Sequence, residues 1–306
     1  MPHPSSPASP ASPACPICGA TQWRDVLTCT DHFVTGEEFH VEACEACGFK
    51  QTKGVPGADV IGNYYHSEAY ISHSNTNKGV MNRVYHLVRT YMLGRKRRII
   101  ASLTPGNRLL DIGSGTGHFL QHMHTHGYQV AGVEVDADTR QRSINRFGLT
   151  VSDPSCLYQA PKKAAFDVVT LWHVLEHVED LDTYLDWIHQ SLTDTGYLIV
   201  AVPNCASLDA TLYGRYWAAY DVPRHRWHFT PADMKALMAR HGFNLITCKA
   251  LPFDAFYNSL MSAGYAGKRP AFLQGGWTGL RSWLNSLGHP ERCSSVIYII
   301  NKQIPG

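Results

Sequence analysis

The sequence of 306 residues lacks any apolar run long enough to cross a bilayer, which takes roughly 18 to 20 residues. Its longest apolar stretches, at residues 197–202 and 296–300, have the length of buried strands. The sequence also lacks a surplus of either charge, with 27 lysines and arginines against 25 aspartates and glutamates. These absences exclude an integral membrane protein and disfavour a nucleic-acid partner, which would require strong electrostatic attraction. The composition predicts a globular protein with one full-sized domain and a smaller one.

A disulfide framework is not indicated either, because the nine cysteines are an odd number and five of them stand alone: Cys29, Cys156, Cys205, Cys248 and Cys293. This usage is typical of a reducing compartment, so we expect a cytoplasmic protein. Residues 1–14 consist of Pro, Ser and Ala with one Met and one His, and they lack the apolar core of a signal peptide. We expect them to form a disordered tail.

The other four cysteines form two C-x2-C pairs, Cys15 with Cys18 and Cys44 with Cys47. Each pair is followed directly by glycine, which permits the tight turn that brings two thiolates to one point. Two such turns complete a tetrahedral set of four sulfurs suited to zinc, and four protein ligands leave no open position for a reacting water. A redox pair would need no twin. The pattern therefore predicts a structural zinc ribbon over residues 15–55.

A helical segment is expected between this ribbon and the next motif, over residues 56–104, where it could cover the active site as a lid. Residues 63–70 and 79–103 are expected to be helices, because the second stretch has apolar side chains close to helical spacing. Tyr64 and Tyr65 are candidate lid residues. The basic run at residues 95–98 is interpreted as a solvated helix turn, followed by a buried strand at residues 99–103.

A glycine-rich turn follows the short apolar strand that begins at Arg108, in the run RLLDIGSGTG. The dinucleotide pattern G-x-G-x-x-G/A needs Gly or Ala at position 118, which is His118. Asp111 stands just before the turn, where a carboxylate would repel a pyrophosphate and attract a ligand carrying an ammonium and a sulfonium. The turn therefore favours a cationic cofactor. About twenty residues later, Glu134 ends a second apolar strand, where its carboxylate can accept both hydroxyls of a ribose.

These motifs, with the run FDVVTLWHVLEHV at residues 166–178, make the sequence resemble the class I S-adenosylmethionine-dependent methyltransferases. The resemblance runs from about residue 105 to residue 306, with residues 195–204 as the fifth strand and 295–301 as a reversed seventh. It implies an α/β fold with a Rossmann-like, doubly wound, seven-stranded sheet, mostly parallel with the last strand antiparallel. It also implies that S-adenosylmethionine is held by residues of the turn and of the neighbouring strand ends: Asp111, Gly113, Ser114, Gly115, Gly117, Glu134, Asp153 and Trp172.

The spacing of His173, Glu176 and His177 would place all three on one face of a helix. As a bare pattern, H-x-x-E-H equals an inverted zinc-protease signature, but its position after a predicted strand argues against a peptidase. Ubiquinone-biosynthesis O-methyltransferases and small-RNA 2′-O-methyltransferases, which the sequence resembles here, carry E-x-x-E-H and hold a divalent cation with it. Three roles stay open for the histidines: general base or substrate contact, ligand of a borderline metal such as Zn²⁺ or Mn²⁺, or packing.

A second histidine cluster lies at residues 221–231, before a helix that Thr230 is expected to cap, with Pro231 at its first position. This segment resembles the one that lines the acceptor pocket in the same methyltransferases. His225, between two arginines, is the stronger candidate for an acceptor contact, and local packing is an equal alternative for His228. Residues 251–290 are expected to form an insertion between the last two strands.

The sequence as a whole predicts in-line transfer of a methyl group from S-adenosylmethionine to a small-molecule acceptor, such as a sugar, a glycan precursor or a phenol. His177, His173 and His225 are the candidates for deprotonating or binding that acceptor. RNA 2′-O-methylation is the alternative enzyme function. A binding module that has lost catalysis is the alternative from a different class, and the intact glycines and Glu134 argue against it.

Overall fold

The computed structural model describes residues 13–57, 59–65 and 80–303, with the backbone alone given for residues 80–85. Most of the expected tail at residues 1–14 and of the expected helix at residues 63–70 therefore lies outside the described residues. A 3-10 turn, η1, spans Ile61–Tyr64 and overlaps the start of the expected helix at residues 63–70. In the described part of the chain, no helix is both long enough and apolar enough to span a membrane.

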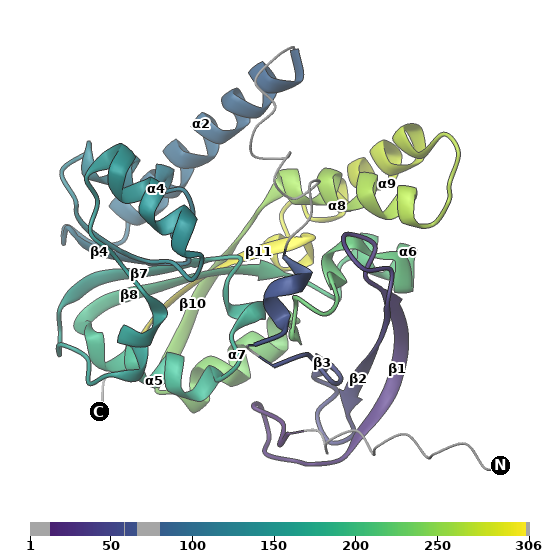
Figure 1. Ribbon diagram of the computed structural model, residues 1–306, viewed down its shortest axis with the longest axis horizontal. Helices are drawn as coiled ribbons and strands as arrows, with labels where there is room; N and C mark the ends of the chain where they lie inside the picture. The colour runs from purple at the N-terminus through teal and green to yellow at the C-terminus, as the bar shows by residue number, and fades with distance from the viewer. Residues whose placement is uncertain (1–12, 58, 66–79, 304–306) are drawn as a thin grey trace.

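The larger of two sheets has seven strands in the order β10-β11-β8-β7-β4-β5-β6 (Figure 1). Strands β8, β7, β4, β5 and β6 run parallel, and β11 pairs antiparallel with both β8 and β10. The fold class predicted from the sequence is confirmed, including the reversed last strand. The strand bounds are β4 Arg108–Ile112, β5 Gln129–Val133, β6 Val151–Ser152, β7 Phe166–Trp172, β8 Leu192–Pro203, β10 Phe243–Ala250 and β11 Ser295–Lys302.

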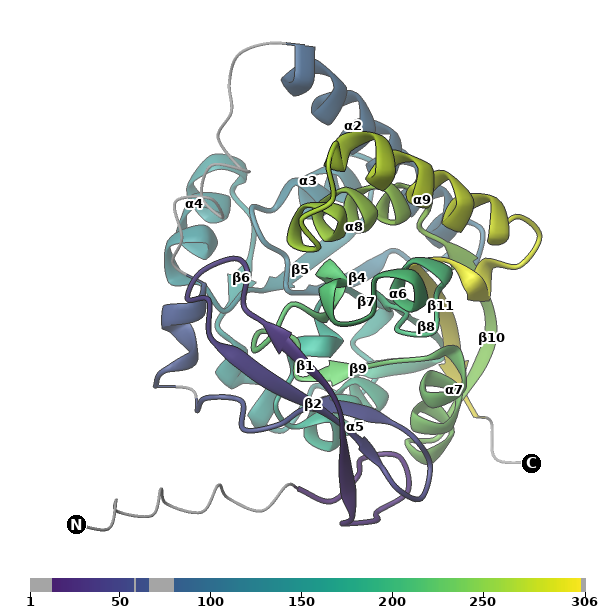
Figure 2. The ribbon, with the colours of Figure 1, turned by 90° about the vertical axis from the view of Figure 1, so that its right-hand side faces the viewer.

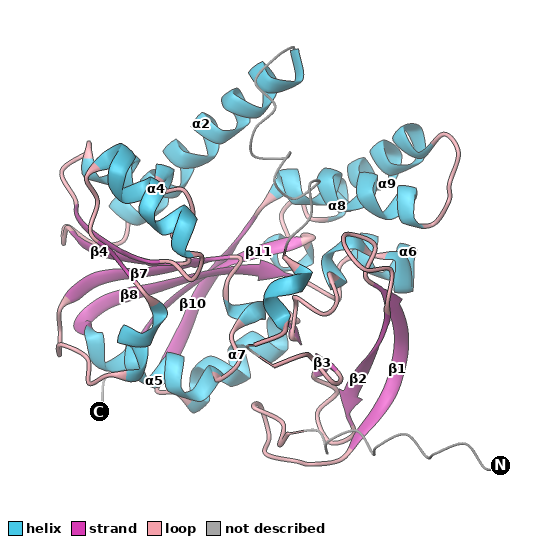
Figure 3. Ribbon diagram, in the orientation of Figure 1, coloured by secondary structure: helices cyan, strands magenta, loops and turns pink. Residues whose placement is uncertain are grey.

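Helices cover both faces of this sheet, because alternate side chains of each buried strand point to opposite faces and both sets are apolar. Leu110 and Val169 pack in one core with α5 (Leu181–Ser191) and α7 (Pro231–Arg240). Leu109 and Val168 pack in a second core with α2 (Val80–Ala101) and α3 (His118–His124). Figure 3 shows the resulting layers, with α4 (Ala137–Phe147) near α2 and with α5 and α7 across the sheet.

The cap predicted for α7 is confirmed. The Thr230 hydroxyl accepts from the backbone N–H of Asp233, the Asp233 carboxylate accepts from the N–H of Thr230, and Pro231 begins the helix. This reciprocal pair satisfies N–H groups that the first helical turn leaves free.

The smaller sheet joins the N-terminal segment to the larger part of the molecule. Its order is β1-β2-β3-β9, with β1 at Trp23–Thr30, β2 at Glu38–Cys44 and β3 at Lys50–Thr52. The fourth strand, β9, is only Trp227–His228, and it comes from the segment between β8 and α7. Figure 2 shows this sheet lying across the front of the molecule.

The prediction of a buried strand at residues 99–103 is wrong, because α2 continues to Ala101. Ile99 and Ile100 are buried against the sheet from the last turn of this helix. A short apolar run suits a buried strand and one turn of a buried helix equally well, and here the helix that carries the basic residues does not stop at them.

The insertion expected at residues 251–290 is present as two packed helices, α8 (Pro252–Tyr265) and α9 (Ala271–Asn285), between β10 and β11. The first turn of α8 faces the end of the sheet, where it contributes Asp254 to the site described below. The remaining short elements are η2 Pro154–Tyr158, η3 Leu175–His177, α6 Leu208–Tyr213, η4 Gly214–Tyr216, η5 Ala218–Tyr220 and η6 Pro290–Arg292.

Candidate active site at the carboxyl edge of the sheet

The glycine-rich turn lies between the end of β4 and the start of α3, and its shape depends on glycine at two positions. Gly113 has φ +75°, and a Cβ there would meet Val174 Cγ2 at 2.3 Å. Gly117 has φ +76°, and a Cβ there would meet Ser143 Cβ at 2.8 Å. Any side chain would be strained at both places and would collide with Val174 or Ser143, so the turn packs against its neighbours only with glycine there.

Glu134, at the end of β5, supports the turn from the neighbouring strand. Its Oε2 accepts a hydrogen bond from the N–H of Gly115 at 2.7 Å, and its Oε1 accepts one from the N–H of Asp136 at 3.0 Å. Each carboxylate oxygen has two lone pairs, so both can accept a further hydrogen bond from a ribose hydroxyl. The side chain is thus fixed in place at the position where the sequence predicts a sugar.

Asp111 is buried at the end of β4, and its Oδ1 accepts a 2.6 Å hydrogen bond from the hydroxyl of Thr170 on β7. Burial raises the pKa of Asp111 to about 7, although the Thr170 hydrogen bond and the charge of Lys96 oppose the shift. A positively charged ligand beside this carboxyl group would favour its ionised form.

Lys96, on α2, reaches the same corner of the site. Its Nζ lies 4.0 Å from the centre of the Trp172 ring and 5.4 Å from that of Phe119. Burial lowers the pKa of Lys96 to about 8, against the opposing charges of Asp111 and Asp254. The interpretation of residues 95–98 as a solvated turn is therefore wrong for Lys96. Lys96 lies four residues after Met92 and four before Ile100. On a helix this spacing places all three side chains on one face, and that was the signal in the sequence.

Three other predicted cofactor residues differ in their exposure and in their hydrogen-bond partners. Trp172 is the last residue of β7, and its buried Nε1 has no acceptor among the described residues. Ser114 is buried, and the space beside Gly132 is filled by its side chain, so its hydroxyl lies against β5. Asp153 is exposed at the start of η2, where it accepts from the N–H of Ser155 and pairs with Arg140 at 3.4 Å.

The prediction that His173, Glu176 and His177 share one face of a helix is wrong. Strand β7 ends at Trp172, His173 has φ +57°, and only a 3-10 turn, η3, follows. The left-handed residue turns the chain sharply, so the imidazole of His173 points toward the insertion and that of His177 points toward the segment before β9.

His173 is held between two carboxylates. Its Nε2 lies 3.1 Å from Asp254 Oδ2, and its Nδ1 lies 3.3 Å from Glu176 Oε1. Burial alone would lower the pKa of His173, but these two partners outweigh it and raise the pKa to about 10. The ring is then cationic at neutral pH, which suits an ion pair that ties α8 to the site and does not suit a proton acceptor.

Glu176, His177 and His225 form a separate cluster, with one ligand atom of each within 4.8 Å of the others. The Nδ1 of His177 lies 2.9 Å from the carbonyl oxygen of Arg224, and the Nδ1 of His225 lies 2.9 Å from that of Ala219. A carbonyl oxygen only accepts, so the Nδ1 of each ring carries a proton.

The carboxylate of Glu176 is fully buried; its Oε1 lies 3.3 Å from His173 Nδ1, and its Oε2 has no hydrogen-bond partner among the described residues. Burial would raise the pKa of Glu176, but the hydrogen bond and charge of His173 lower it. Burial and the neighbouring His225 lower the pKa of His177 to about 4, so its ring is neutral at neutral pH. The cluster thus combines an ionised acid, Glu176, with the neutral imidazole of His177.

The segment before β9 is fixed by the N-terminal sheet. The Thr52 hydroxyl donates to the carbonyl oxygen of His225 at 2.7 Å. The backbone N–H of Thr52 donates to the carbonyl oxygen of Arg226 at 2.9 Å. The N–H of Arg226 in turn donates to the carbonyl oxygen of Glu176 at 2.8 Å. Backbone hydrogen bonds therefore connect the ribbon to the histidine cluster.

Of the other residues predicted near the acceptor, Tyr65 contacts the histidine cluster, whereas His228 and Tyr64 pack elsewhere. His228 is buried, with Nε2 2.9 Å from the Thr52 hydroxyl and its ring against Tyr220, which matches the packing alternative. Tyr65 places its hydroxyl 3.2 Å from the Nδ1 of His177. Tyr64 points away from the cluster, since its hydroxyl donates to Glu37 in the ribbon at 2.5 Å.

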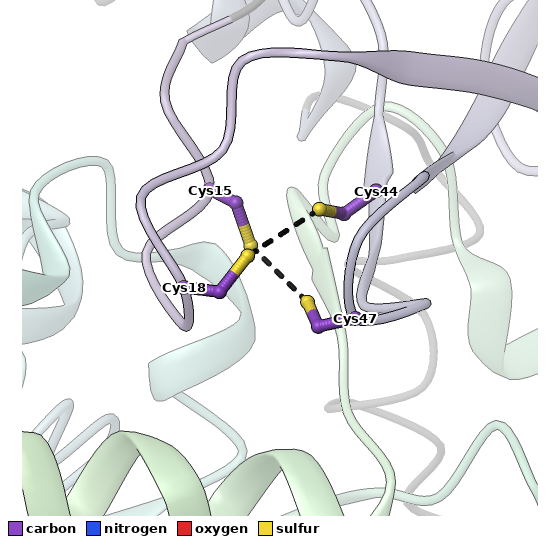
Figure 4. A group of neighbouring side chains, drawn as sticks. All are labelled: Cys15, Cys18, Cys44 and Cys47. Carbon is purple, nitrogen blue, oxygen red and sulfur yellow. Dashed lines mark hydrogen bonds between the residues drawn. The ribbon is translucent and has the colours of Figure 1, made fainter.

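The four paired cysteines converge as predicted (Figure 4). The sulfurs of Cys15 and Cys47 are 3.6 Å apart, as are those of Cys18 and Cys44. Four sulfurs at the usual Zn–S distance around one zinc lie about 3.8 Å from one another. Both the donor set and its spacing fit a structural zinc ion.

The structure adds three residues to the site that sequence reasoning did not place there: Lys96, Thr170 and Asp254. Thr170 faces Asp111 because parallel strands β4 and β7 pair these two residues. Asp254 comes from an insertion of unassigned conformation, and no sequence pattern connects it with His173. Only Lys96 carried a usable signal, its helical spacing.

A seven-stranded sheet of this order, with a glycine-rich turn and an acid at the ends of neighbouring strands, defines a Rossmann-like cofactor-binding fold. The model of the methyltransferase domain family matches residues 85–248, more than half of the chain. The chain belongs to this family.

Similar proteins include ubiquinone biosynthesis O-methyltransferases. That of Cereibacter sphaeroides is 30% identical over 164 residues, covering 49% of this chain and 65% of the relative. That of Azorhizobium caulinodans is 29% identical, covering 50% of this chain and 66% of the relative. The match thus spans slightly less than two thirds of each relative.

Among solved structures, phosphoethanolamine N-methyltransferase 2 of Haemonchus contortus, in complex with S-adenosyl-L-methionine, aligns with a TM-score of 0.51 at 17% identity. The alignment covers 84% of this chain and 62% of that chain. At this level of identity the likeness shows the fold.

Proposed function

We propose that this protein transfers the methyl group of S-adenosylmethionine to a hydroxyl group of a small-molecule acceptor, with His177 as the base. The observation that carries the proposal is that the glycine-rich turn with Glu134 and the cluster around His177 lie at the same edge of one sheet. Family membership supports the methyl transfer, and the O-methyltransferase relatives support a hydroxyl acceptor.

The cofactor would supply an activated methyl group on a sulfonium, so the protein has to bind, orient and exclude water rather than activate the donor. Glu134 would accept the ribose hydroxyls, and the open space beside Gly115 would let the cofactor approach the turn. Asp111 would face the positive charge of the methionyl end.

The acceptor hydroxyl would attack the methyl carbon in line with the carbon–sulfur bond, which breaks as the carbon–oxygen bond forms. Its proton would pass to the Nε2 of His177, whose Nδ1–H is anchored on the Arg224 carbonyl. The buried carboxylate of Glu176 would stabilise the imidazolium that results. The raised pKa of His173 removes it from the candidates for this step and leaves His225 as an acceptor contact.

The experiment is replacement of His177 by Gln, with turnover measured as release of S-adenosylhomocysteine and cofactor affinity measured by calorimetry. General-base catalysis contributes roughly 10²- to 10⁴-fold, so we expect turnover to fall by about that factor with cofactor affinity unchanged. His124, exposed on α3, provides the control His124→Gln. Equal loss in both variants, or none in His177→Gln, would contradict the assignment.

A second candidate for the same cluster is a divalent cation, favoured by the buried Oε2 of Glu176, which has no hydrogen-bond partner among the described residues. The Nδ1–H of each histidine is held by a carbonyl oxygen, which leaves Nε2 as the possible ligand atom, the usual arrangement of metal-binding histidine. Glu176, His177 and His225 would hold the ion, which would lower the pKa of a bound acceptor hydroxyl.

Elemental analysis of the purified protein separates the two candidates. With His177 as base, we expect one zinc per chain, which Cys44→Ser removes and Glu176→Gln does not. Two equivalents of metal, one of them lost in Glu176→Gln, would support the cation instead. No zinc at all would contradict the ribbon site.

A further inference from the structure

We propose that the outer face of α9, together with the basic loop that precedes this helix, is a docking surface for an anionic lipid membrane. The helix would lie on the membrane without crossing it. This proposal goes beyond methyl transfer and does not depend on it.

The packing of α9 against α8 carries the first step of the argument. The side of α9 that faces α8 carries the small residues Gly275, Gly279 and Ser282, all of them buried. A Cβ at Gly275 would meet the Cα of Leu260 at 2.7 Å, and one at Gly279 would meet the Cα of Phe256 at 2.9 Å. The two helix backbones are therefore too close together for larger side chains to pack between them.

The large apolar side chains of α9 point the other way. Leu273, Trp277 and Leu284 are spaced four and seven residues apart, so they share one face of the helix. They are 63%, 62% and 49% exposed, and Phe272 beside them is 74% exposed. Figures 1 and 2 show α9 on the outer side of α8. A helix of a globular protein ordinarily turns its apolar face to the core, so this face indicates a partner outside the chain.

Exposed apolar side chains also occur on the neighbouring helices. Leu87 and Tyr91, one turn apart on α2, are both exposed, and the Tyr91 ring lies edge-on to that of Phe253 on α8, with 6.0 Å between their centres. Apolar side chains that are exposed as a group, rather than singly, mark an interaction surface.

The charges of this helix pair indicate the chemistry of the partner. Between Asp254 and Glu291 the chain has no acid and three cations, Lys268, Arg269 and Arg281, all of them exposed. Each of the two flanking acids is paired with a histidine. Since the net charge of the whole chain is only +2, the excess of positive charge is concentrated beside the apolar face. The partner should therefore be anionic.

An anionic bilayer surface matches both features. Trp and Phe side chains insert at the boundary between headgroups and acyl chains, and each nearby Lys or Arg adds about fivefold in affinity for anionic headgroups. A second copy of the chain would instead bring the same cations together. No helix of the described residues is long and apolar enough to span a membrane, so α9 should lie in the plane of the surface.

The test is sedimentation of the full-length, zinc-loaded protein with vesicles of phosphatidylcholine, alone or with about one quarter phosphatidylglycerol. We expect the wild type to bind the anionic vesicles, to bind the neutral ones more weakly, and to be released as the salt concentration rises. Trp277→Ser should weaken binding to the anionic vesicles by about tenfold or more, because it removes a large apolar side chain from the membrane boundary.

Two further variants separate the charges from the apolar face. The double variant Lys268→Gln with Arg269→Gln should weaken binding to anionic vesicles by about 25-fold and leave binding to neutral vesicles unchanged. Ile246→Ser removes an exposed apolar side chain from β10 and is the matched control, which should bind as the wild type does. All three variants should keep the melting temperature of the wild type and its affinity for S-adenosylmethionine, because the replaced side chains are exposed and lie outside the site.

The proposal is overturned if the wild type does not sediment with anionic vesicles, or if it binds neutral and anionic vesicles equally. It is also overturned if Ile246→Ser weakens binding as much as Trp277→Ser does. A wild-type dimer that Trp277→Ser dissociates, with no vesicle binding, would assign the face to a second copy of the chain. In each of these cases the proposed methyl transfer stands, since turnover is measured without vesicles.

Discussion

At the scale of single residues, the site consists of charged groups whose burial and neighbours decide what each can do. His173 and His177 are four residues apart, yet one has its pKa raised to about 10 and the other lowered to about 4. The sequence predicted both as candidates for the same step. It could not separate them, because burial lowers the pKa of His177, while Asp254, which is distant in the chain, helps to raise that of His173.

Glu134 provides the most direct residue-scale prediction. Replacing it with Ala removes the acceptor for the ribose hydroxyls together with the support of the Gly115 N–H. We expect affinity for S-adenosylmethionine to fall by about 2 to 3 kcal/mol, measured by calorimetry. Asp194→Ala, at a fully exposed site, is the control. An unchanged dissociation constant in Glu134→Ala would exclude the ribose contact.

The raised pKa of Asp111 predicts a pH dependence of cofactor binding. With a pKa of about 7 in the free protein, this carboxyl group is mostly neutral below that pH and attracts a cation only once it ionises. Affinity for S-adenosylmethionine should therefore rise as the pH increases from about 6 to about 7.5. The dependence should flatten in Asp111→Asn. Affinity that stays constant over this range in the wild type would show that Asp111 does not face the ligand's charge.

At the scale of elements, strands and caps were more predictable than turns and short pairings. The strands at the glycine-rich turn and the capped α7 follow from local patterns of apolar spacing and capping residues. The reversed β11 followed from the family resemblance. Strand β9 is two residues long and is defined only by its pairing with β3, so no local sequence pattern predicts it. The turn at His173 was missed for a similar reason, since its φ of +57° is imposed by its surroundings.

The pairing of β3 with β9 predicts that the ribbon positions the histidine cluster. Thr52→Val removes the hydroxyl that donates to the His225 carbonyl and contacts His228. We expect the free energy of unfolding to drop by about 1 to 3 kcal/mol, because a buried acceptor loses its donor. We also expect lower kcat with unchanged affinity for S-adenosylmethionine, because Asp111, the glycine-rich turn and Glu134 lie at the ends of β4 and β5.

The matched control is Thr28→Val, which removes an exposed ribbon hydroxyl that contacts only His40. It should change neither kcat nor cofactor affinity. If Thr52→Val weakens cofactor binding as much as it lowers kcat, the ribbon does not act through the histidine segment alone.

At the scale of the whole molecule, the sequence predicted the fold class and the two metal-binding turns but not how the two parts combine. The four cysteines anchor a small sheet whose last strand belongs to the methyltransferase domain, and the insertion α8 adds Asp254 from the other direction. Both the N-terminal ribbon and the late insertion thus contact the loops around η3. These are contacts between segments far apart in the chain, which a single sequence read locally cannot supply.

The central claim is that the protein moves a methyl group from S-adenosylmethionine to a small molecule. The most direct measurement is to incubate the wild type with methyl-labelled S-adenosylmethionine and a cell extract, then separate small molecules from RNA and protein. We predict label in the small-molecule fraction with the wild type and little with His177→Gln. Label confined to RNA, or no labelled product from a protein that binds the cofactor, would contradict the account.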